Sequence, residues 1–219
     1  MKNFFQQVVI KNAFFFLGAA WLFTIAFIID NYWYSSSSAK YLRKNIESDI
    51  QQQERDFDIF IKDTSLLRRL VNQQYSASEL NVLTEKKPYC LFLYTTGDNA
   101  TPDLKFWNTQ LILPNTDLQQ GTETNELVKL TNGQYECIRR QLTIADNRKL
   151  VALALVPVRR EYYLELDNLK KEFVNYPQAE KSVSITAAPT DYPVKSITGN
   201  TLFYLQAKFI AEKENTNWV

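Results

Sequence analysis

Hydrophobic residues are most concentrated near the amino end, in the uncharged run Ala13–Ile29. Together with Asp30 at its carboxyl edge, this run predicts a transmembrane helix over residues 13–30. Such a helix is about 27 Å long, which is at the short end for a membrane span. The aromatic residues of Tyr32–Tyr34 follow directly, where such rings favour a membrane–water interface. We therefore expect a cytoplasmic tail (1–12), one membrane span, and a long domain beyond it.

A cleaved signal peptide is the alternative, because Ser37 and Ala39 are small residues with the spacing of a cleavage site. The hydrophobic run is longer than that of most signal peptides, and three bulky aromatic residues separate it from this site, which favours an uncleaved anchor. Lys and Arg residues are nearly balanced on the two flanks, so the cytoplasmic amino end is inferred from the usual layout of such anchors. The expected location is the inner membrane, crossed once, with the main domain in the periplasm.

A polar segment with regularly spaced apolar residues follows the serine run Ser35–Ser38. The helical spacing of these apolar residues predicts a long amphipathic helix over residues 39–62. They are Leu42, Ile46, Ile50, Phe57, Phe60 and Ile61. Two shorter helices are expected, one at Ser65–Val71 and one near Ser76, which has the spacing of a capping box with Glu79.

The pattern then changes to short segments rich in β-branched and aromatic residues, which predict strands. The first five are Tyr89–Thr95, Phe106–Leu113, Leu127–Thr131, Gln134–Ala145 and Lys149–Val158, and a smaller set follows at Val183–Thr186, Val194–Thr198 and Thr201–Phe209. The pair Asn132-Gly133 between two strand patterns is a strong hairpin signal. Short turns of this kind favour an antiparallel sheet. Between the two sets of strands, the helical spacing of apolar residues in Glu161–Phe173 predicts a helix.

Composition excludes several classes of function. The net charge is +1, with 25 basic and 24 acidic residues, so nucleic acid is not an expected partner. The chain has no His, which excludes Ser-His-Asp and Cys-His catalysis and any zinc site that needs His. No phosphate-binding or dinucleotide-binding motif is present, so we expect neither an enzyme nor a bound cofactor or metal.

The two cysteines, Cys90 and Cys137, fall in separate predicted strands. In an oxidising compartment they are candidates for one disulfide, worth about 4 kcal/mol on the chain-entropy model. The alternative is two unpaired buried thiols. The sequence leaves both open, since a bridge needs a specific Cα separation.

The segment Leu150–Phe173 resembles the extracytoplasmic sensor region of membrane histidine kinases from the Bacteroidetes. In that pattern a hydrophobic strand ends in Pro, an aliphatic residue and a basic residue, followed at fixed distances by Tyr, Leu and Phe. The matching residues are Pro157, Val158, Arg159, Tyr162, Leu169 and Phe173. Ile197–Leu205 resembles the hairpin that follows in this family, whereas Leu166 and Asn168 depart from the family pattern, which has Asn and Tyr there.

The resemblance implies an α+β fold, with the amino-terminal transmembrane helix continuing into the long helix, then a PAS-like or Cache-like antiparallel sheet with flanking helices. The expected sensor domain covers 39–219, divided into the long helix 39–62, a main sheet lobe 63–173 and a small carboxyl-terminal lobe 174–209. No second span, dimerisation helix or kinase core follows in the sequence. The chain is then the sensor portion of a longer receptor or a stand-alone relative of one.

A ligand site is predicted from strand alternation. Along Gln134–Ala145, Arg140 shares the apolar face of the strand, so it is expected to meet a carboxylate, carbonyls or an anionic ligand. The alternatives to a ligand are an internal ion pair or exposure at the sheet edge. Trp107 and Tyr94 on preceding strands complete a candidate pocket with Arg140. The pair Arg159-Arg160, near Tyr162 and Tyr163, is the second candidate site.

The function expected from the sequence is the input region of a two-component sensor histidine kinase. A homodimer would detect a small molecule or a partner protein and signal by rearrangement of its long helix. A non-signalling envelope scaffold, or a secretion or pilus assembly protein, is the alternative. A second span and a kinase core encoded after Val219 would favour the receptor.

Overall fold

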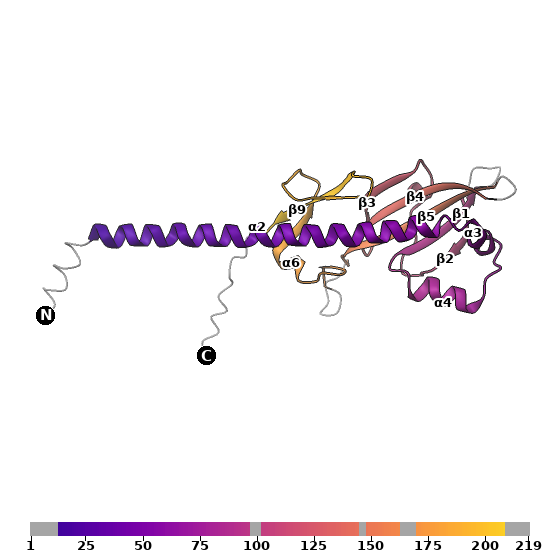
Figure 1. The fold of residues 1–219 in the computed structure, drawn as a ribbon, viewed down its shortest axis with the longest axis horizontal. Helices are drawn as coiled ribbons and strands as arrows, with labels where there is room; N and C mark the ends of the chain where they lie inside the picture. Colours follow the sequence, from indigo (N-terminus) through magenta and orange to yellow (C-terminus); the bar gives the residue numbers. More distant parts are fainter. Residues whose placement is uncertain (1–12, 97–101, 145–147, 163–169, 209–219) are drawn as a thin grey trace.

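A single 48-residue helix, α2 (Ala13–Phe60), runs from the apolar amino-terminal segment into the folded domain. The structure, a computed structural model, describes residues 13–96, 102–144, 148–162 and 170–208 (Figure 1). The amino-terminal half of α2 projects away from the sheets, and its carboxyl-terminal half lies along them. At 1.5 Å per residue the helix is about 72 Å long.

The described residues contain no helix that is both apolar enough and long enough to cross a membrane. The prediction of a transmembrane helix over 13–30 is therefore not supported, although Ala13–Ile29 is helical as expected. Its 17 uncharged residues reach about 26 Å, less than the roughly 30 Å of hydrocarbon in a typical bilayer.

Two short helices and a six-stranded antiparallel sheet follow α2. The helices are α3 (Thr64–Val71) and α4 (Ala77–Glu85). The strands are β1 (Cys90–Thr96), β2 (Pro102–Trp107), β3 (Thr124–Leu130), β4 (Gly133–Ile144), β5 (Arg148–Arg160) and β6 (Glu172–Phe173), with the one-turn helix α5 (Thr116–Gln119) before β3. The spatial order is β2-β1-β5-β4-β3, with β6 paired to the end of β5.

A second, three-stranded sheet has the order β7-β9-β8. Its strands are β7 (Val183–Thr186), β8 (Pro193–Lys195) and β9 (Thr201–Ala207), preceded by the one-turn helix α6 (Ala179–Ser182). The division into a larger and a smaller sheet confirms the mixed α+β class with an antiparallel sheet and flanking helices.

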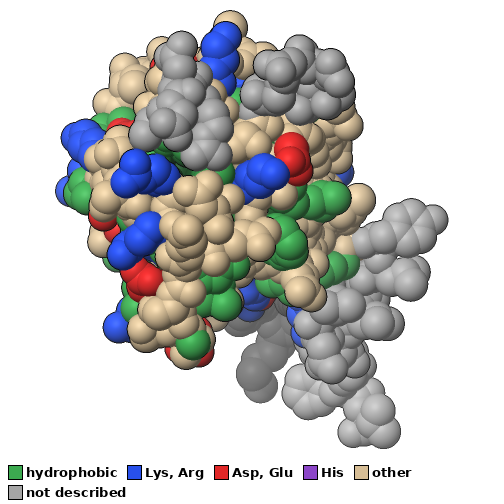
Figure 2. Space-filling model, turned by 90° about the vertical axis from the view of Figure 1, so that its right-hand side faces the viewer, with side chains coloured by type: hydrophobic (Ala, Val, Ile, Leu, Met, Phe, Trp, Pro, Cys, Tyr) green, Lys and Arg blue, Asp and Glu red, His purple; other side chains and the backbone are tan. Residues whose placement is uncertain are grey.

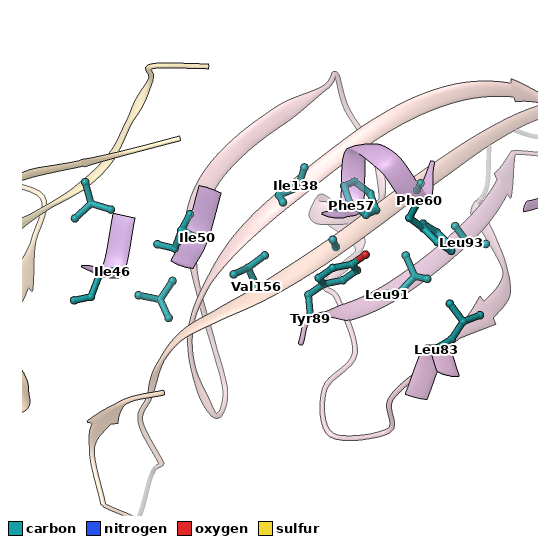
Figure 3. Close-up of a cluster of buried hydrophobic side chains, with 14 of the residues drawn as sticks. Ile46, Ile50, Phe57, Phe60, Leu83, Tyr89, Leu91, Leu93, Ile138 and Val156 are labelled. Carbon is teal, nitrogen blue, oxygen red and sulfur yellow. The ribbon is translucent and has the colours of Figure 1, made fainter. Parts of the chain in front are cut away.

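The apolar face of α2 packs on one face of the main sheet (Figure 3). Ile50 and Phe57 of the helix belong to one buried cluster with Ile138 and Val156 of the central strands, Ile46 joins this cluster further along the helix, and all five side chains are buried. Complete burial of a side chain such as Phe57 contributes about 2–3 kcal/mol, so this contact fixes α2 against the sheet. The predicted helical periodicity of residues 42–61 is thereby confirmed.

The opposite face of the main sheet has its own apolar cluster. Phe92, Tyr94 and Leu153 lie there beneath Ile112 and Leu118, which come from the segment between β2 and β3. Arg139 holds that segment down, since its Nε donates to the carbonyl oxygen of Thr122 (2.6 Å) and its Nη1 to that of Leu118 (2.9 Å). Both faces of the sheet are thus covered, which explains why the middle of β5 is apolar on both sides.

Local signals placed most turns and caps correctly. Ser76 and Glu79 form the expected capping box at α4, and Asn132-Gly133 forms the expected hairpin between β3 and β4. Two predictions were wrong. The strand predicted at Phe106–Leu113 ends at Trp107, because the Asn108 side chain replaces the strand pairing, and the helix predicted at Glu161–Phe173 ends instead in strand β6. Residues 163–169 of that segment lie outside the described part.

Candidate functional site: an aromatic groove coupled to the long helix

A groove of about 1010 Å³ lies next to α4, at the start of β1 and the end of β2. Aromatic side chains form much of its lining, and four of the lining residues are basic while none is acidic. The aromatic residues are Tyr75, Tyr89, Phe106, Trp107, Tyr135 and Tyr162, and the basic residues are Lys87, Lys105, Arg159 and Arg160. Figure 2 views the end of the domain that carries α3 and α4, where hydrophobic and basic side chains lie next to one another. Such a lining suits an apolar ligand with an anionic group.

Asn108 fixes one wall of this groove. Its side-chain oxygen accepts from the backbone N–H of Leu91 (2.7 Å), and its amide nitrogen donates to the carbonyl oxygens of Leu83 (2.9 Å) and Tyr89 (3.1 Å). One buried amide therefore joins α4, β1 and the end of β2. Trp107 directly precedes it and is 45 % exposed, so its indole is available to a ligand.

Two groove residues contact α2 through one carboxylate. Lys87 Nζ lies 2.6 Å from Asp56 Oδ2, and the Tyr89 hydroxyl donates to the same oxygen at 2.7 Å. Lys87 also lies over the rings of Phe60 and Tyr89, 5.7 Å from each centroid. Burial and the Asp56 carboxylate together raise the pKa of Tyr89 far above its ordinary value, so its hydroxyl stays a hydrogen-bond donor. The groove is thus connected directly to the long helix.

The other cations of the groove differ in how firmly they are held. Arg159 is 8 % exposed and donates to both carboxylate oxygens of Glu180 (2.9 and 2.6 Å), so it has a structural role. The Arg160 side chain is 50 % exposed and lies 3.4 Å from Glu172, and Lys105 pairs with the exposed Asp103. Arg160 and Lys105 are therefore cations that an incoming anion can reach without breaking a buried ion pair, and Arg160 is the more exposed of the two.

A row of polar side chains along α2 forms a second contact, with the segment Pro193–Ile197 at β8. Arg43 Nη1 donates to the carbonyl oxygen of Pro193 (3.4 Å), and Glu47 Oε2 accepts from the N–H of Lys195 (2.9 Å). Gln51 donates to the carbonyl oxygen of Lys195 (3.0 Å), and Glu54 Oε2 accepts from the N–H of Ile197 (2.6 Å). Because these four residues recur at helical spacing, one face of α2 holds the small sheet by its backbone.

The three residues predicted as a ligand pocket do not come together in the described structure. Trp107 lines the groove, but Tyr94 is buried in the cluster on the other face of the main sheet from Arg140. Arg140 Nη1 donates to Asn125 Oδ1 (2.7 Å) and to the carbonyl oxygens of Thr124 and Arg139, and its Nε lies 3.7 Å from Asp58 Oδ1. Arg140 therefore lies in an internal ion pair with Asp58, which was the alternative to a ligand contact.

The cysteines have the second of the two expected arrangements, since Cys90 and Cys137 are unpaired thiols. Both lie in the cluster beneath Ile112, and burial raises the pKa of Cys90 to about 11 and that of Cys137 to about 12. The thiols therefore remain protonated and unreactive at neutral pH.

The sequence analysis missed Asp56, Lys87, Tyr89 and Asn108. No local pattern links Lys87 to Asp56, which lies 31 positions away along the chain. The second candidate pair, Arg159-Arg160, was closer, because both residues line the groove together with Tyr162.

The chain matches no family model, and comparison with curated proteins and with solved structures also gives no match.

Proposed function

We propose that this chain is the extracytoplasmic signal-sensing region of a membrane-attached receptor, of the kind that forms the input of a two-component sensor histidine kinase. The ligand is a small molecule with an aromatic or apolar body and an anionic group, bound in the groove at Trp107. A homodimer signals by rearrangement of α2, within a PAS-like or Cache-like α+β domain.

The observation that carries this proposal is the contact of two groove residues, Lys87 and Tyr89, with Asp56 of α2. A ligand that moves either side chain changes a contact of the helix itself. Because α2 is continuous from Phe60 back to Ala13, a shift at Asp56 is transmitted along the whole helix.

The amino-terminal part of α2 supports attachment to a membrane. Large apolar side chains of residues 13–29 are exposed, with Phe14 87 % and Phe23 81 % accessible, and others lie on every side of the helix. An exposed apolar surface that extends around a helix favours insertion into lipid. The segment therefore anchors the domain, and the folded part lies outside the bilayer.

The ligand proposal is tested by thermal unfolding of the full chain in a mild detergent, with a panel of aromatic and aliphatic carboxylates, amino acids and sugar acids. Binding to the folded state raises the melting temperature by an amount that grows with the logarithm of the ratio of ligand concentration to Kd. We expect Trp107→Ala to fold and lose the response, and Arg160→Gln to weaken it for anionic compounds. Leu113→Ala, an exposed apolar residue of the same segment outside the groove, is the matched control.

Retention of the full response in Trp107→Ala would exclude the groove as the site. If no compound stabilises the wild-type chain while a partner protein does, the small-molecule ligand is wrong and a protein signal replaces it. A chain that binds neither, yet assembles with envelope proteins, would favour the scaffold alternative.

A further inference from the structure

Two glutamates from different elements are buried against each other between α2 and the main sheet. Glu54 of α2 is 1 % exposed and Glu136 of β4 is 0 % exposed, and the side-chain amide of Asn125 donates to both carboxyl groups. Two ionised carboxylates that share one buried donor repel each other, so this arrangement favours a proton on one of the two.

The remaining oxygens have few donors. Asn125 Nδ2 of β3 lies 2.6 Å from Glu54 Oε1 and 3.2 Å from Glu136 Oε1, and the N–H of Ile197 donates to Glu54 Oε2. Glu136 Oε2 is buried and has no donor among the described residues. It is therefore the oxygen at which we place the proton.

The charges that face the pair do not balance two carboxylates. Among the described residues, Asp58 lies one turn further along α2, and Arg140 of β4 has its guanidinium engaged by Asp58 and Asn125. The neighbouring β5 contributes apolar residues, since Val156 lies opposite Glu136, and the β8–β9 segment contributes the backbone N–H of Ile197. With both glutamates ionised, three carboxylates would share one guanidinium.

We propose that the Glu54–Glu136 pair is a proton-binding site that holds one proton at neutral pH and fastens α2 to both sheets. Loss of the proton leaves two buried carboxylates that share one amide donor, and their repulsion moves α2 away from β4. Because Glu54 also holds Ile197, the same movement loosens the small sheet.

The direction of the titration follows from burial. Burial, then the hydrogen bond and the charge of Glu54, raise the pKa of Glu136 well above the ordinary value of a glutamate. A group with a raised pKa in the folded state stabilises the fold fully below its unfolded pKa, and this stabilisation is lost as the pH rises toward the folded pKa. The pair therefore binds its proton tightly in acid and releases it in alkali. Proton binding stands on this geometry alone, and only its role in signalling rests on the proposed function.

The absence of His makes the site measurable, because no ordinary side chain titrates between about pH 5 and about pH 7. In urea unfolding of the full chain in a mild detergent, without ligand, we expect the equilibrium constant for unfolding to rise by up to about tenfold per pH unit across this window. Glu136→Gln, whose amide replaces the protonated carboxyl, should abolish the dependence. Glu126→Gln, an exposed glutamate of the adjacent strand, should keep it.

A second measurement holds even if Glu136→Gln does not fold. Infrared spectra of the wild-type chain should contain the carbonyl band of one protonated, buried carboxylic acid at neutral pH, and Glu54→Gln should shift that band. Absence of the band, or a wild-type stability that is flat across the window, overturns the proposal. If the pair binds a proton but no compound or partner protein binds the chain, the proton site still stands and the proposed receptor function is wrong.

Discussion

Cys90 and Cys137 lie opposite the same residue, Leu155, from the two strands that flank β5. Adjacent strands are about 4.8 Å apart, so the two Cα atoms are separated by about 9–10 Å, beyond the roughly 4.4–6.8 Å that a disulfide spans. The pairing of β1 and β4 with the same central strand therefore keeps the thiols apart.

We predict that the folded chain, produced in an oxidising compartment, contains two free thiols. Mass spectrometry after alkylation in denaturant should find both cysteines modified, and alkylation of the native chain should be slow, because Cys137 is buried, Cys90 is half-buried and both thiols are protonated. The melting temperature should be the same with and without reductant. A cross-linked peptide pair would contradict the strand order of the main sheet.

Removal of the Arg140 side chain should destabilise the unliganded domain. Arg140→Ala removes three hydrogen bonds and leaves Asp58 with a weaker partner, at an expected cost of about 1–3 kcal/mol, reduced from the fully buried case by partial exposure. Urea unfolding measures this cost, and Arg55→Ala, an exposed arginine of α2, should have little effect. Loss of ligand response without loss of stability would restore Arg140 as a ligand residue.

The Glu180 carboxylate should stabilise the fold at neutral pH, and this stabilisation should be lost at low pH. Burial works to raise the pKa of Glu180, but hydrogen bonds from Arg159 and Lys208 outweigh it, so the pKa is lowered. A carboxylate with a lowered pKa stabilises the fold above its unfolded pKa and loses this effect as the pH falls. Glu180→Gln should therefore cost about 1–3 kcal/mol at neutral pH and progressively less below about pH 4. Glu85→Gln, exposed at the end of α4, is the control.

Gly133 should tolerate a methyl group less well than Gly199. A Cβ at Gly133 would lie 2.3 Å from the carbonyl oxygen of Arg159, a backbone atom that cannot move without breaking the pairing of β4 with β5. At Gly199 there is open space, and the left-handed φ of 86° adds only about 1–2 kcal/mol of strain. Unfolding of the two alanine variants tests this order, and equal stability of the two would contradict the close approach of β4 and β5.

The sequence determined those features whose cause is local. Helical spacing identified the buried face of α2, because residues three and four apart necessarily share a side. The capping box at Ser76 and the hairpin at Asn132-Gly133 depend on backbone groups within a few residues. Alternation along β4 also placed Glu136 and Arg140 on the face that α2 covers.

The tertiary structure alone decided which distant residues meet. β5 enters between β1 and β4, and this order separates the cysteines and puts Tyr94 and Arg140 on opposite faces. The strand of Trp107 ends early because Asn108 finds partners on α4 and β1, which no local pattern specifies. Glu54 and Glu136 each lie on a buried face that the periodicity predicts, yet their contact depends on how α2 docks on the sheet. Periodicity reports which side of an element is buried, whereas the partner across that side is set by packing of the whole chain.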